Sequence, residues 1–541
     1  MLLDKKAEDL IIHVAERLDN GSAPYIDEVA DSGLDNHPQL AFHFLQLLPN
    51  YYEPFPELGF SSSNYQAALA LFHDSLMKLR QEMEKNRAWA EEIINHLQHR
   101  VANEILVPEM GHHLQHDVLN ALKEAGVDIL PEVKQANQRM LAYYNRFWQK
   151  QPMPDPAKIL AEMEKEGLSN VFDIAAVILA QLRLIPATQD QINVLERLAD
   201  SGESRLREVV GIMLLHPDTP VRQQVPDLLI RCVQNQTLSP KTFRRMIVMR
   251  NWWPVRERPL LDQAIRTARL AGLSCAPSET GKVTSLYVSG IDGSGAQAIW
   301  TLIRTQDGWL MAHFLGCLEQ GIREAWCTRA EERIDLASVL ERTDGDLALM
   351  PVKPEFLNHA LGHYMADGHA QSKVPPMELL RVAEATGGNG WDSQRIDPDL
   401  FAADESNLSA QRMSTILQSS DVWSLEEGFA YSWFEDDGEI DAIISQHPDL
   451  PGDMVQVVEE VSDLIIEEIL EPRRQRWYYC FLLMALALYQ SKPRRRASWK
   501  KFFALAKALA QDTPMEDIPL MGMIAARTIY AAVLRTEKQE G

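Results

Sequence analysis

Apolar residues recur at helical spacing through most of the chain. Near the start, Leu10, Ile11 and Val14 lie one, three and four residues apart, which places them on one face of a helix. The same period returns over most of residues 157–275 and again from residue 410 to the end. This pattern predicts a mainly α-helical protein.

One stretch breaks the helical pattern. Val283–Ser289, Ala296–Arg304 and Trp309–Leu318 are runs of β-branched, aliphatic and aromatic residues. They are separated by Gly290–Gly295 and Gln306–Gly308, and each of these turns contains Asp-Gly. Such runs between Asp-Gly turns are typical of antiparallel strands. We therefore expect a central β-meander of three strands.

Clusters of Pro, Gly and Asp divide the helical segments. Three prolines fall within Pro152–Pro156, where they end a helix and stiffen a linker. A second loop-rich region runs from Thr386 to Asp404. One long polar helix is predicted from Tyr65 past Arg100, and Gly321–Thr343 after the meander is also predicted to be helical.

Residues 205–233 are predicted to form two short helices joined by a tight turn. Arg205–Leu215 and Val221–Val233 are amphipathic, and His216–Pro220 is the turn between them. The passage Leu214–Arg222, with an Asp in the turn and Val-Arg after it, resembles the turn within a HEAT or armadillo repeat. The resemblance implies stacked helix pairs that share a continuous core, as in an α-solenoid.

We therefore expect a mainly α fold, in which HEAT-like stacked helix pairs accompany a small central antiparallel β-meander. The expected domains, in chain order, are an N-terminal helical domain at 1–150, HEAT-like helical repeats at 157–275, a meander-containing segment at 276–350, a helix with Gly- and Asp-rich loops at 351–403, and a C-terminal helical domain at 404–541.

The charge, the apolar runs and the cysteines of the chain indicate which kinds of partner and compartment to expect. The formal net charge is −24, and a surface this acidic repels nucleic acid and anionic membranes. The longest apolar run, Cys480–Tyr489, is too short to span a bilayer, and the N-terminus lacks a signal-peptide profile. The five cysteines form no CxxC pair. We expect a cytoplasmic protein with reduced thiols and no cofactor, whose partner is another protein and not a membrane.

Three histidines, His359, His363 and His369, stand at relative positions 0, 4 and 10, which is the spacing of the metzincin zinc proteases. This pattern can hold zinc or another divalent metal. However, Ala360 stands where that family places its Glu general base, so no base for a metal-bound water is evident. The alternatives are a solvated helix face, and a metal site that recruits a further carboxylate such as Asp367.

Two adjacent tryptophans, Trp252 and Trp253, end one predicted helix. On a helix their side chains point about 100° apart, so we expect one to pack and the other to be partly exposed. Core anchoring is one interpretation, and an aromatic contact site for a partner is the other.

The chain has one dense basic run, at residues 492–501. Its residues that we expect to contact a partner are Arg494, Arg495, Arg496, Trp499, Lys500 and Lys501. A tryptophan among cations suits an acidic protein segment or nucleic acid. The same cations can instead pair with the acidic helices of the chain itself.

Two polar loops are predicted to be structural. Ile291–Gly295 lies between predicted strands and does not open a helix, so a hairpin turn is favoured over a phosphate-binding loop. Glu435–Glu439 lacks the alternating acids of an EF-hand, and it predicts a helix boundary with solvated acids.

The functional prediction rests on the helical pattern, because no local catalytic motif occurs. Stacked helix pairs present extended, curved faces that bind macromolecules. We predict a non-enzymatic interaction or scaffold protein that uses the tryptophan pair and the basic run. The second hypothesis is a metal-dependent enzyme or metal-binding protein using the three histidines. The third is a nucleic-acid-associated factor that uses residues 492–501.

Overall fold

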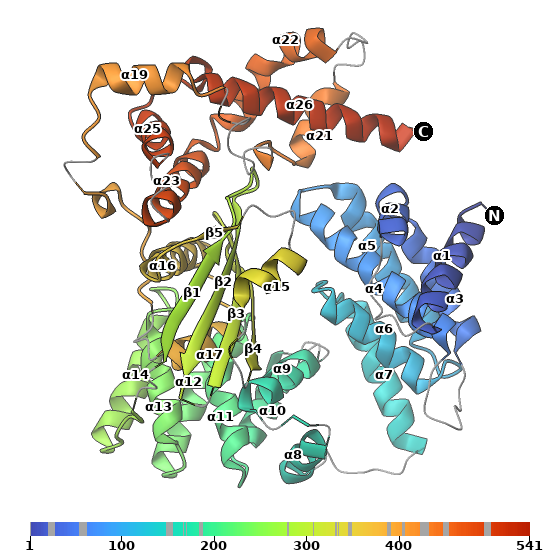
Figure 1. The fold of residues 1–541 in the computed structure, drawn as a ribbon. Coiled ribbons are helices and arrows are strands. Elements are labelled where there is room, and N and C mark those ends of the chain that lie inside the picture. The colour runs from blue at the N-terminus through green and yellow to red at the C-terminus, as the bar shows by residue number, and fades with distance from the viewer. Residues whose placement is uncertain are drawn as a thin grey trace.

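The computed structural model is mainly helical and has a five-stranded antiparallel sheet near its centre, as the sequence predicts in outline (Figure 1). The structure describes residues 2–19, 28–52, 62–147, 155–165, 167–168, 170–182, 185, 188–277, 281–306, 308–330, 333, 335–343, 349–386, 391–402, 406–421, 423, 432–446, 454–491 and 499–540.

The N-terminal helices form a unit with its own hydrophobic core, drawn in blue in Figure 1. They are α1 (Leu2–Asp19), α2 (Glu28–Asn36), α3 (Leu40–Tyr51), α4 (Ser63–Glu84), α5 (Ala88–Arg100), the π-helix η1 (Val101–Ile105), α6 (His112–Glu124) and α7 (Pro131–Phe147). Every buried apolar residue of their cluster lies between Ala7 and Met140. Among the described residues, this N-terminal unit therefore shares no hydrophobic core with the rest of the chain.

The predicted single helix from Tyr65 past Arg100 is wrong. The structure has two helices there, α4 and α5, which are separated at Lys85–Arg87. Asn86 adopts a left-handed backbone with φ of 57°, which interrupts the helix. No Pro or Gly marks this break, so the hydrophobic period alone could not reveal it.

The second group of helices forms two layers below the sheet in Figure 1. It comprises α8 (Pro156–Lys165), α9 (Val171–Leu182), α10 (Thr188–Ala199), α11 (Ser204–Ile212), the 3₁₀ turn η2 (Met213–Leu215), α12 (Thr219–Gln234), α13 (Pro240–Arg250) and α14 (Arg258–Leu270). α11 packs against α9 and α13, while α12 packs against α10 and α14. We call α9–α14 the helical array.

The sheet has five strands in the order β4-β3-β2-β1-β5, and all neighbours are antiparallel. The strands are β1 (Lys282–Val288), β2 (Ala296–Thr305), β3 (Gly308–Cys317), β4 (Gly321–Ala330) and β5 (Met350–Pro351). The three predicted strands are confirmed as β1, β2 and β3. The loop at Ile291–Gly295 is confirmed as the turn between the first two.

The helix predicted at Gly321–Thr343 is confirmed only at its end, where α15 (Leu336–Thr343) lies, and it is wrong over its first ten residues, which form β4. Ala325 is more buried than Glu324 and Trp326 on either side of it, which is the alternation of a strand. The turn before β4 uses positive φ angles at Glu319 (65°) and Gly321 (95°). It lacks the Asp-Gly pair that identified the other turns.

Helices cover the sheet unequally. α16 (Glu355–Ala370) and α17 (Glu378–Thr386) pack on one face, where they contribute to the main core. The short α15 (Leu336–Thr343) lies on the other face, where Leu336 and Leu340 join Trp300 and Leu302 in a small separate cluster.

The C-terminal helices lie at the opposite end of the sheet from the helical array, in orange and red in Figure 1. They are the 3₁₀ turn η3 (Pro398–Leu400), α19 (Ala410–Gln418), α21 (Gly438–Ser445), α22 (Met454–Ile465), the π-helix η5 (Ile466–Leu470), α23 (Arg474–Gln490), α25 (Trp499–Ala510), the 3₁₀ turn η6 (Met515–Asp517) and α26 (Pro519–Glu540). α23 packs against α25 and α16, so it connects this group to the sheet.

The N-terminal unit is held to the C-terminal helices by a cluster of ion pairs that we call the charged junction. Its members are Lys85, Arg87, Glu435, Asp436, Asp437, Asp441, Arg473, Arg476 and Arg535. Lys85 Nζ lies 2.8 Å from Asp436, and Arg87 Nε lies 3.1 Å from Asp441. The predicted helix boundary is confirmed, because α21 begins at Gly438, but the prediction that its acids are solvated is wrong for Glu435, which is only 2% exposed.

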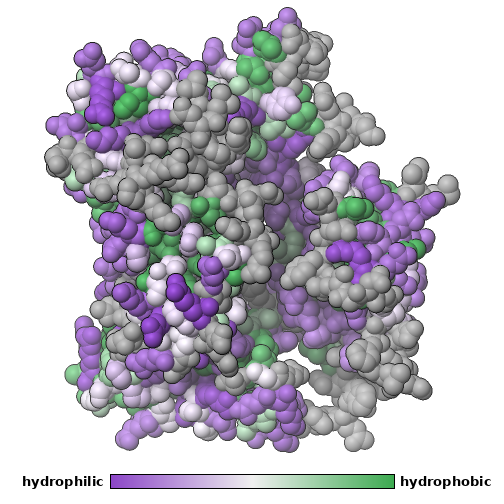
Figure 2. Space-filling model, in the orientation of Figure 1, coloured by the Kyte–Doolittle hydropathy of each residue, from purple (hydrophilic) through white to green (hydrophobic). Residues whose placement is uncertain are grey.

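The surface is hollowed where the N-terminal unit meets the rest of the molecule (Figure 2). Among the described residues, no helix is both long enough and apolar enough to cross a membrane.

Candidate functional site

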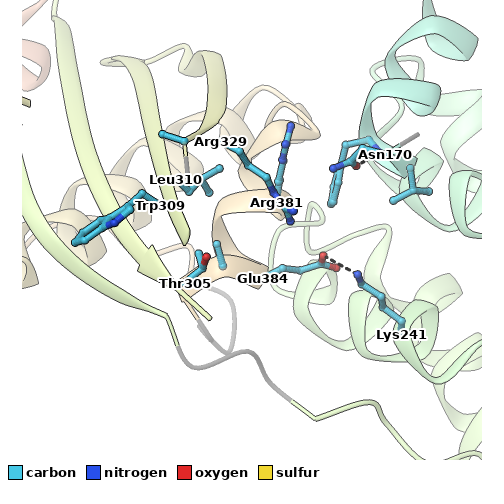
Figure 3. Close-up of a pocket in the computed structure, with 12 residues that line it drawn as sticks. Asn170, Lys241, Thr305, Trp309, Leu310, Arg329, Arg381 and Glu384 are labelled. Atoms are coloured by element: carbon cyan, nitrogen blue, oxygen red, sulfur yellow. Dashed lines mark hydrogen bonds and ion pairs between the residues drawn. The ribbon is translucent and has the colours of Figure 1, made fainter. Parts of the chain in front are cut away.

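A pocket of about 390 Å³ opens where the helical array meets the sheet (Figure 3). The start of α9, the first turn of α13, α17 and the ends of three strands form its walls. The lining residues are Asn170, Val171, Phe172, Lys241, Thr305, Trp309, Leu310, Arg329, Ala330, Arg381, Glu384 and Ala385. We call this site the seam pocket.

Three cations from three different elements line the seam pocket. Lys241 comes from the first turn of α13, a helix start that is fixed because the Ser239 hydroxyl accepts a hydrogen bond from the backbone N–H of Thr242 at 3.0 Å. Arg329 comes from the end of β4, and Arg381 comes from α17. The fold therefore gathers positive charge that is dispersed in the sequence.

One carboxylate, Glu384, also lines the pocket, and a buried arginine behind it is shared between Glu384 and Glu208. Arg245 is 1% exposed, and its Nε and Nη2 donate to the two carboxylate oxygens of Glu384. Its Nη1 donates to Glu208 at 3.0 Å. Its guanidinium also lies 5.2 Å from the ring centre of Phe172. Lys241 Nζ is 3.8 Å from the same Glu384 carboxylate, as Figure 3 shows.

The remaining cations are weakly compensated. Arg381 Nη1 lies 3.5 Å from Asp173, a residue that is about half exposed, and the Nε of Arg381 is buried without a hydrogen-bond partner. Arg329 is exposed and makes no ion pair with another described residue. Guanidinium and ammonium groups arranged in this way suit a carboxylate or a phosphate.

Apolar surface adjoins these cations. Leu310 of β3 lines the pocket on the sheet side, and Ala385 lines it from α17, whereas the Trp309 ring points away from the cations toward the cluster on the other face of the sheet (Figure 3). The guanidinium of Arg304 lies 5.8 Å from the ring centre of Trp309. A ligand that enters the pocket therefore meets apolar side chains beside its charged group.

The structure contradicts the predicted metal site at His359, His363 and His369. Among the described residues, no three His, Cys, Asp or Glu side chains are placed to hold a metal ion. His369 donates through Nε2 to the Trp252 carbonyl at 2.5 Å, and its Nδ1 accepts from the Ser393 hydroxyl at 2.7 Å. Both ring nitrogens of His369 are therefore engaged within the protein.

His363 is buried, which corrects the expected solvated helix face. Its Nδ1 accepts from the Ile396 backbone N–H at 3.2 Å, and its Nε2 lies 3.5 Å from the Asp367 carboxylate. Burial lowers the pKa of His363 to about 4. His359 lines a second pocket, of about 460 Å³, that is separate from the seam pocket.

Trp252 and Trp253 are both fully buried, which corrects their prediction as partner contacts. Trp252 stacks on Trp391 with ring centres 6.2 Å apart. The Trp253 indole N–H donates to the Leu214 carbonyl at 2.8 Å, so this ring ties α13 to the turn before α12. Adjacent tryptophans are both buried because neighbouring elements cover both sides of the chain.

The basic run is described only in part. Residues 492–498, which include the three predicted arginine contacts, lie outside the described residues. Trp499 is 2% exposed and stacks on Phe401 at 5.1 Å, so its prediction as a partner contact is wrong. Lys500 Nζ lies 5.5 Å from the ring centre of Trp499, and Lys501 Nζ lies 5.1 Å from another tryptophan ring.

Sequence reasoning missed the seam pocket. Lys241, Arg329 and Arg381 each stand in an ordinary amphipathic or alternating pattern, and they are separated by 88 and 52 positions. Only the packing of the sheet on the helical array brings the three cations together.

Comparisons with known proteins match two parts of the chain. Residues 394–533 match the family model described as the Y4lR C-terminal helical domain, and residues 188–272 match that of the Y4lR second domain. The chain is 26% identical over 323 residues to "Uncharacterized protein y4lR" of Sinorhizobium fredii (strain NBRC 101917 / NGR234). This alignment covers 57% of the chain and 59% of that protein, so the chain spans about three fifths of the relative. No solved structure matches the chain.

Proposed function

We propose that this chain is a non-enzymatic interaction protein that binds an acidic segment of another protein in the seam pocket. The observation that supports it is the gathering of Lys241, Arg329 and Arg381 on one pocket of a chain whose net charge is −24. Long-range repulsion by the acidic surface disfavours polyanions in general. A short segment that places one acidic group in the pocket avoids most of that repulsion.

The helical array supports the same proposal. In its two layers α11 packs between α9 and α13 and α12 between α10 and α14, and this packing supports the proposal of stacked helix pairs. Buried Arg222 joins successive pairs, because it hydrogen-bonds the His216 carbonyl at 2.8 Å and forms an ion pair with Glu257 at 3.0 Å. Such arrays provide rigid surfaces for macromolecular partners. All five cysteines are free thiols, which is consistent with action in the cytoplasm.

A defined peptide tests the proposal. The acidic probe is a fluorescent peptide of about ten residues that alternates Val and Thr and ends in a Glu pair, and the basic probe ends in a Lys pair instead. We expect the full chain to bind the acidic probe and not the basic one in an anisotropy titration. Lys241→Glu and Arg329→Glu should each weaken binding about tenfold, because each replaces a favourable charge with a repulsive one.

A matched control separates the pocket from the overall charge. Lys5→Glu makes the same change of charge at an exposed position on α1. It should leave the affinity for the acidic probe within about twofold of the unmodified chain. Equal weakening by all three substitutions, or equal binding of both probes, would contradict the proposal.

A further inference from the structure

β4 is an open edge of the sheet. It is ten residues long, and its only neighbour in the sheet order is β3. Among the described residues, no segment other than β3 hydrogen-bonds to its backbone. One row of backbone N–H and C=O groups is therefore available to another strand.

The opposite edge of the sheet is different. β5 is two residues long. The next residue, Val352, donates its backbone N–H to the Leu286 carbonyl at 3.0 Å and forms an antiparallel bridge with Ser491, so this edge is covered. Short, covered edges of this kind are how proteins prevent unwanted strand pairing. β4 has no comparable cover over its second half in the described chain.

The two ends of β4 have different surroundings. Near its start, Arg323 forms an ion pair with Glu84 at the end of α4, so the N-terminal unit borders the strand there. Near its end, Arg329 and Ala330 line the seam pocket. Between them, Trp326 is 37% exposed and packs edge-on against Trp300, with ring centres 5.2 Å apart.

This arrangement aligns an open edge, an exposed aromatic side chain and a cation-lined pocket. We infer that the partner segment docks as an added strand along β4, with its acidic side chain in the seam pocket. The inference rests on the proposed function and specifies its partner as an extended peptide. Main-chain hydrogen bonds would hold the segment, and the pocket would select its charge.

Charge complementarity selects this occupant over a second copy of the chain. Two copies each carry a net charge of −24, so they repel at long range. A short acidic segment concentrates its charge where Arg329, Arg381 and Lys241 can neutralise it. Its alternate side chains would lie beside Trp326 on the outer face of the sheet.

Backbone methylation of the acidic probe tests the inference. An added strand donates hydrogen bonds from every second residue, because alternate N–H groups face away from the edge. Two versions of the probe carry N-methyl groups, one at odd central positions and the other at even central positions. We expect one version to bind about tenfold more weakly than the other, with the better binder within about twofold of the unmethylated probe.

Deuterium exchange supplies a second measurement on the unmodified chain. Peptides that cover residues 321–330 should gain protection when the acidic probe binds. Equal affinities of the two methylated versions, or no gain of protection in β4, would overturn the strand inference.

The controls distinguish the two proposals. If binding depends on the pocket cations but the two methylated versions bind equally well, the proposed function is retained and the added strand is ruled out. Binding that ignores Lys241→Glu and Arg329→Glu, or no binding at all, removes the proposed function and the inference with it. Protection of β4 that rises with protein concentration without probe, together with a dimer in light scattering, would assign the edge to a second copy and overturn the inference.

Discussion

Buried polar residues join separate elements of this fold. His363 on α16 accepts a hydrogen bond from Ile396 through Nδ1, so its neutral ring carries its proton on Nε2, near Asp367. Asp367 in turn accepts from the backbone N–H of Glu319 at 2.8 Å and from Arg395 at 3.0 Å. These bonds tie α16 to the β3–β4 turn and to the loop after α17. The histidine is therefore part of the core of the protein.

The neutral state of His363 makes stability depend on pH. Its folded pKa is about 4 against an ordinary value of 6.5, so between these values the unfolded chain binds the proton more readily. This contribution to stability is complete above pH 6.5 and is lost as the pH falls toward 4. We expect His363 to account for about 2 kcal/mol of the stability lost between pH 7.5 and 5 in urea unfolding.

Two substitutions check this assignment. His363→Asn keeps an acceptor for Ile396 and does not titrate, so its stability should fall by about 2 kcal/mol less over the same pH range. Asn103→Gln changes an exposed residue that does not titrate and should keep the original pH dependence. Identical pH dependence in the unmodified chain and His363→Asn would show that another group controls it.

Among the helices and strands, the sequence predicted those whose turns are set by nearby residues. The Asp-Gly turns and apolar runs predicted β1 to β3. β4 was missed because its turn depends on positive φ angles at Glu319 and Gly321, which no turn signature announced. Gly321 lies against Gly368 of α16, a contact that only the folded chain creates.

The candidate site was less predictable than the fold. One of Trp252 and Trp253 was expected to be partly exposed, and Trp499 was expected to contact a partner, because aromatic residues next to cations or loops often bind partners. Their burial depends on helices far away in sequence, such as the packing of Trp499 on Phe401. The three cations that line the seam pocket are far apart in the sequence, and the residues next to each of them do not indicate that they form one site.

The β1–β2 turn offers a direct test of how the sheet is attached to the C-terminal helices. Gly293 N donates to the Ser432 carbonyl at 3.0 Å, and a Cβ at this residue would lie 1.9 Å from the Phe434 carbonyl oxygen. Because that obstacle is backbone, Gly293→Ala should lower the free energy of unfolding by about 2 kcal/mol or more. Gly202→Ala, where nothing lies within 4 Å, should change it by less than about 0.5 kcal/mol. Similar effects of the two substitutions in urea unfolding would contradict the close contact.

At the scale of the whole molecule, the N-terminal unit is attached by charge more than by apolar packing. It has a separate hydrophobic cluster, and the charged junction links it to α21 and α26. Arg87 is central to the junction, since its buried guanidinium contacts Glu82, Asp436 and Asp441. Polar interfaces of this kind between parts of a chain permit relative motion when a key contact is lost.

Removing one charge should therefore release the N-terminal unit without unfolding it. Arg87→Gln leaves Asp436 and Asp441 less compensated, and we expect a larger radius of gyration in small-angle scattering with unchanged helical circular dichroism. Arg100→Gln removes an exposed pair within one helical segment and should leave the radius of gyration unchanged. A radius of gyration that stays constant in Arg87→Gln would show that other contacts hold the unit in place.

A charge exchange in the seam pocket tests whether the pocket recognises an acidic segment by its charge. The double variant Lys241→Glu/Arg329→Glu and the unmodified chain would each be titrated with the acidic and the basic probe. We expect the unmodified chain to prefer the acidic probe and the double variant to prefer the basic one, each by about tenfold or more. The same preference in both proteins would show that the pocket cations play no part in recognition, and it would overturn the proposed function.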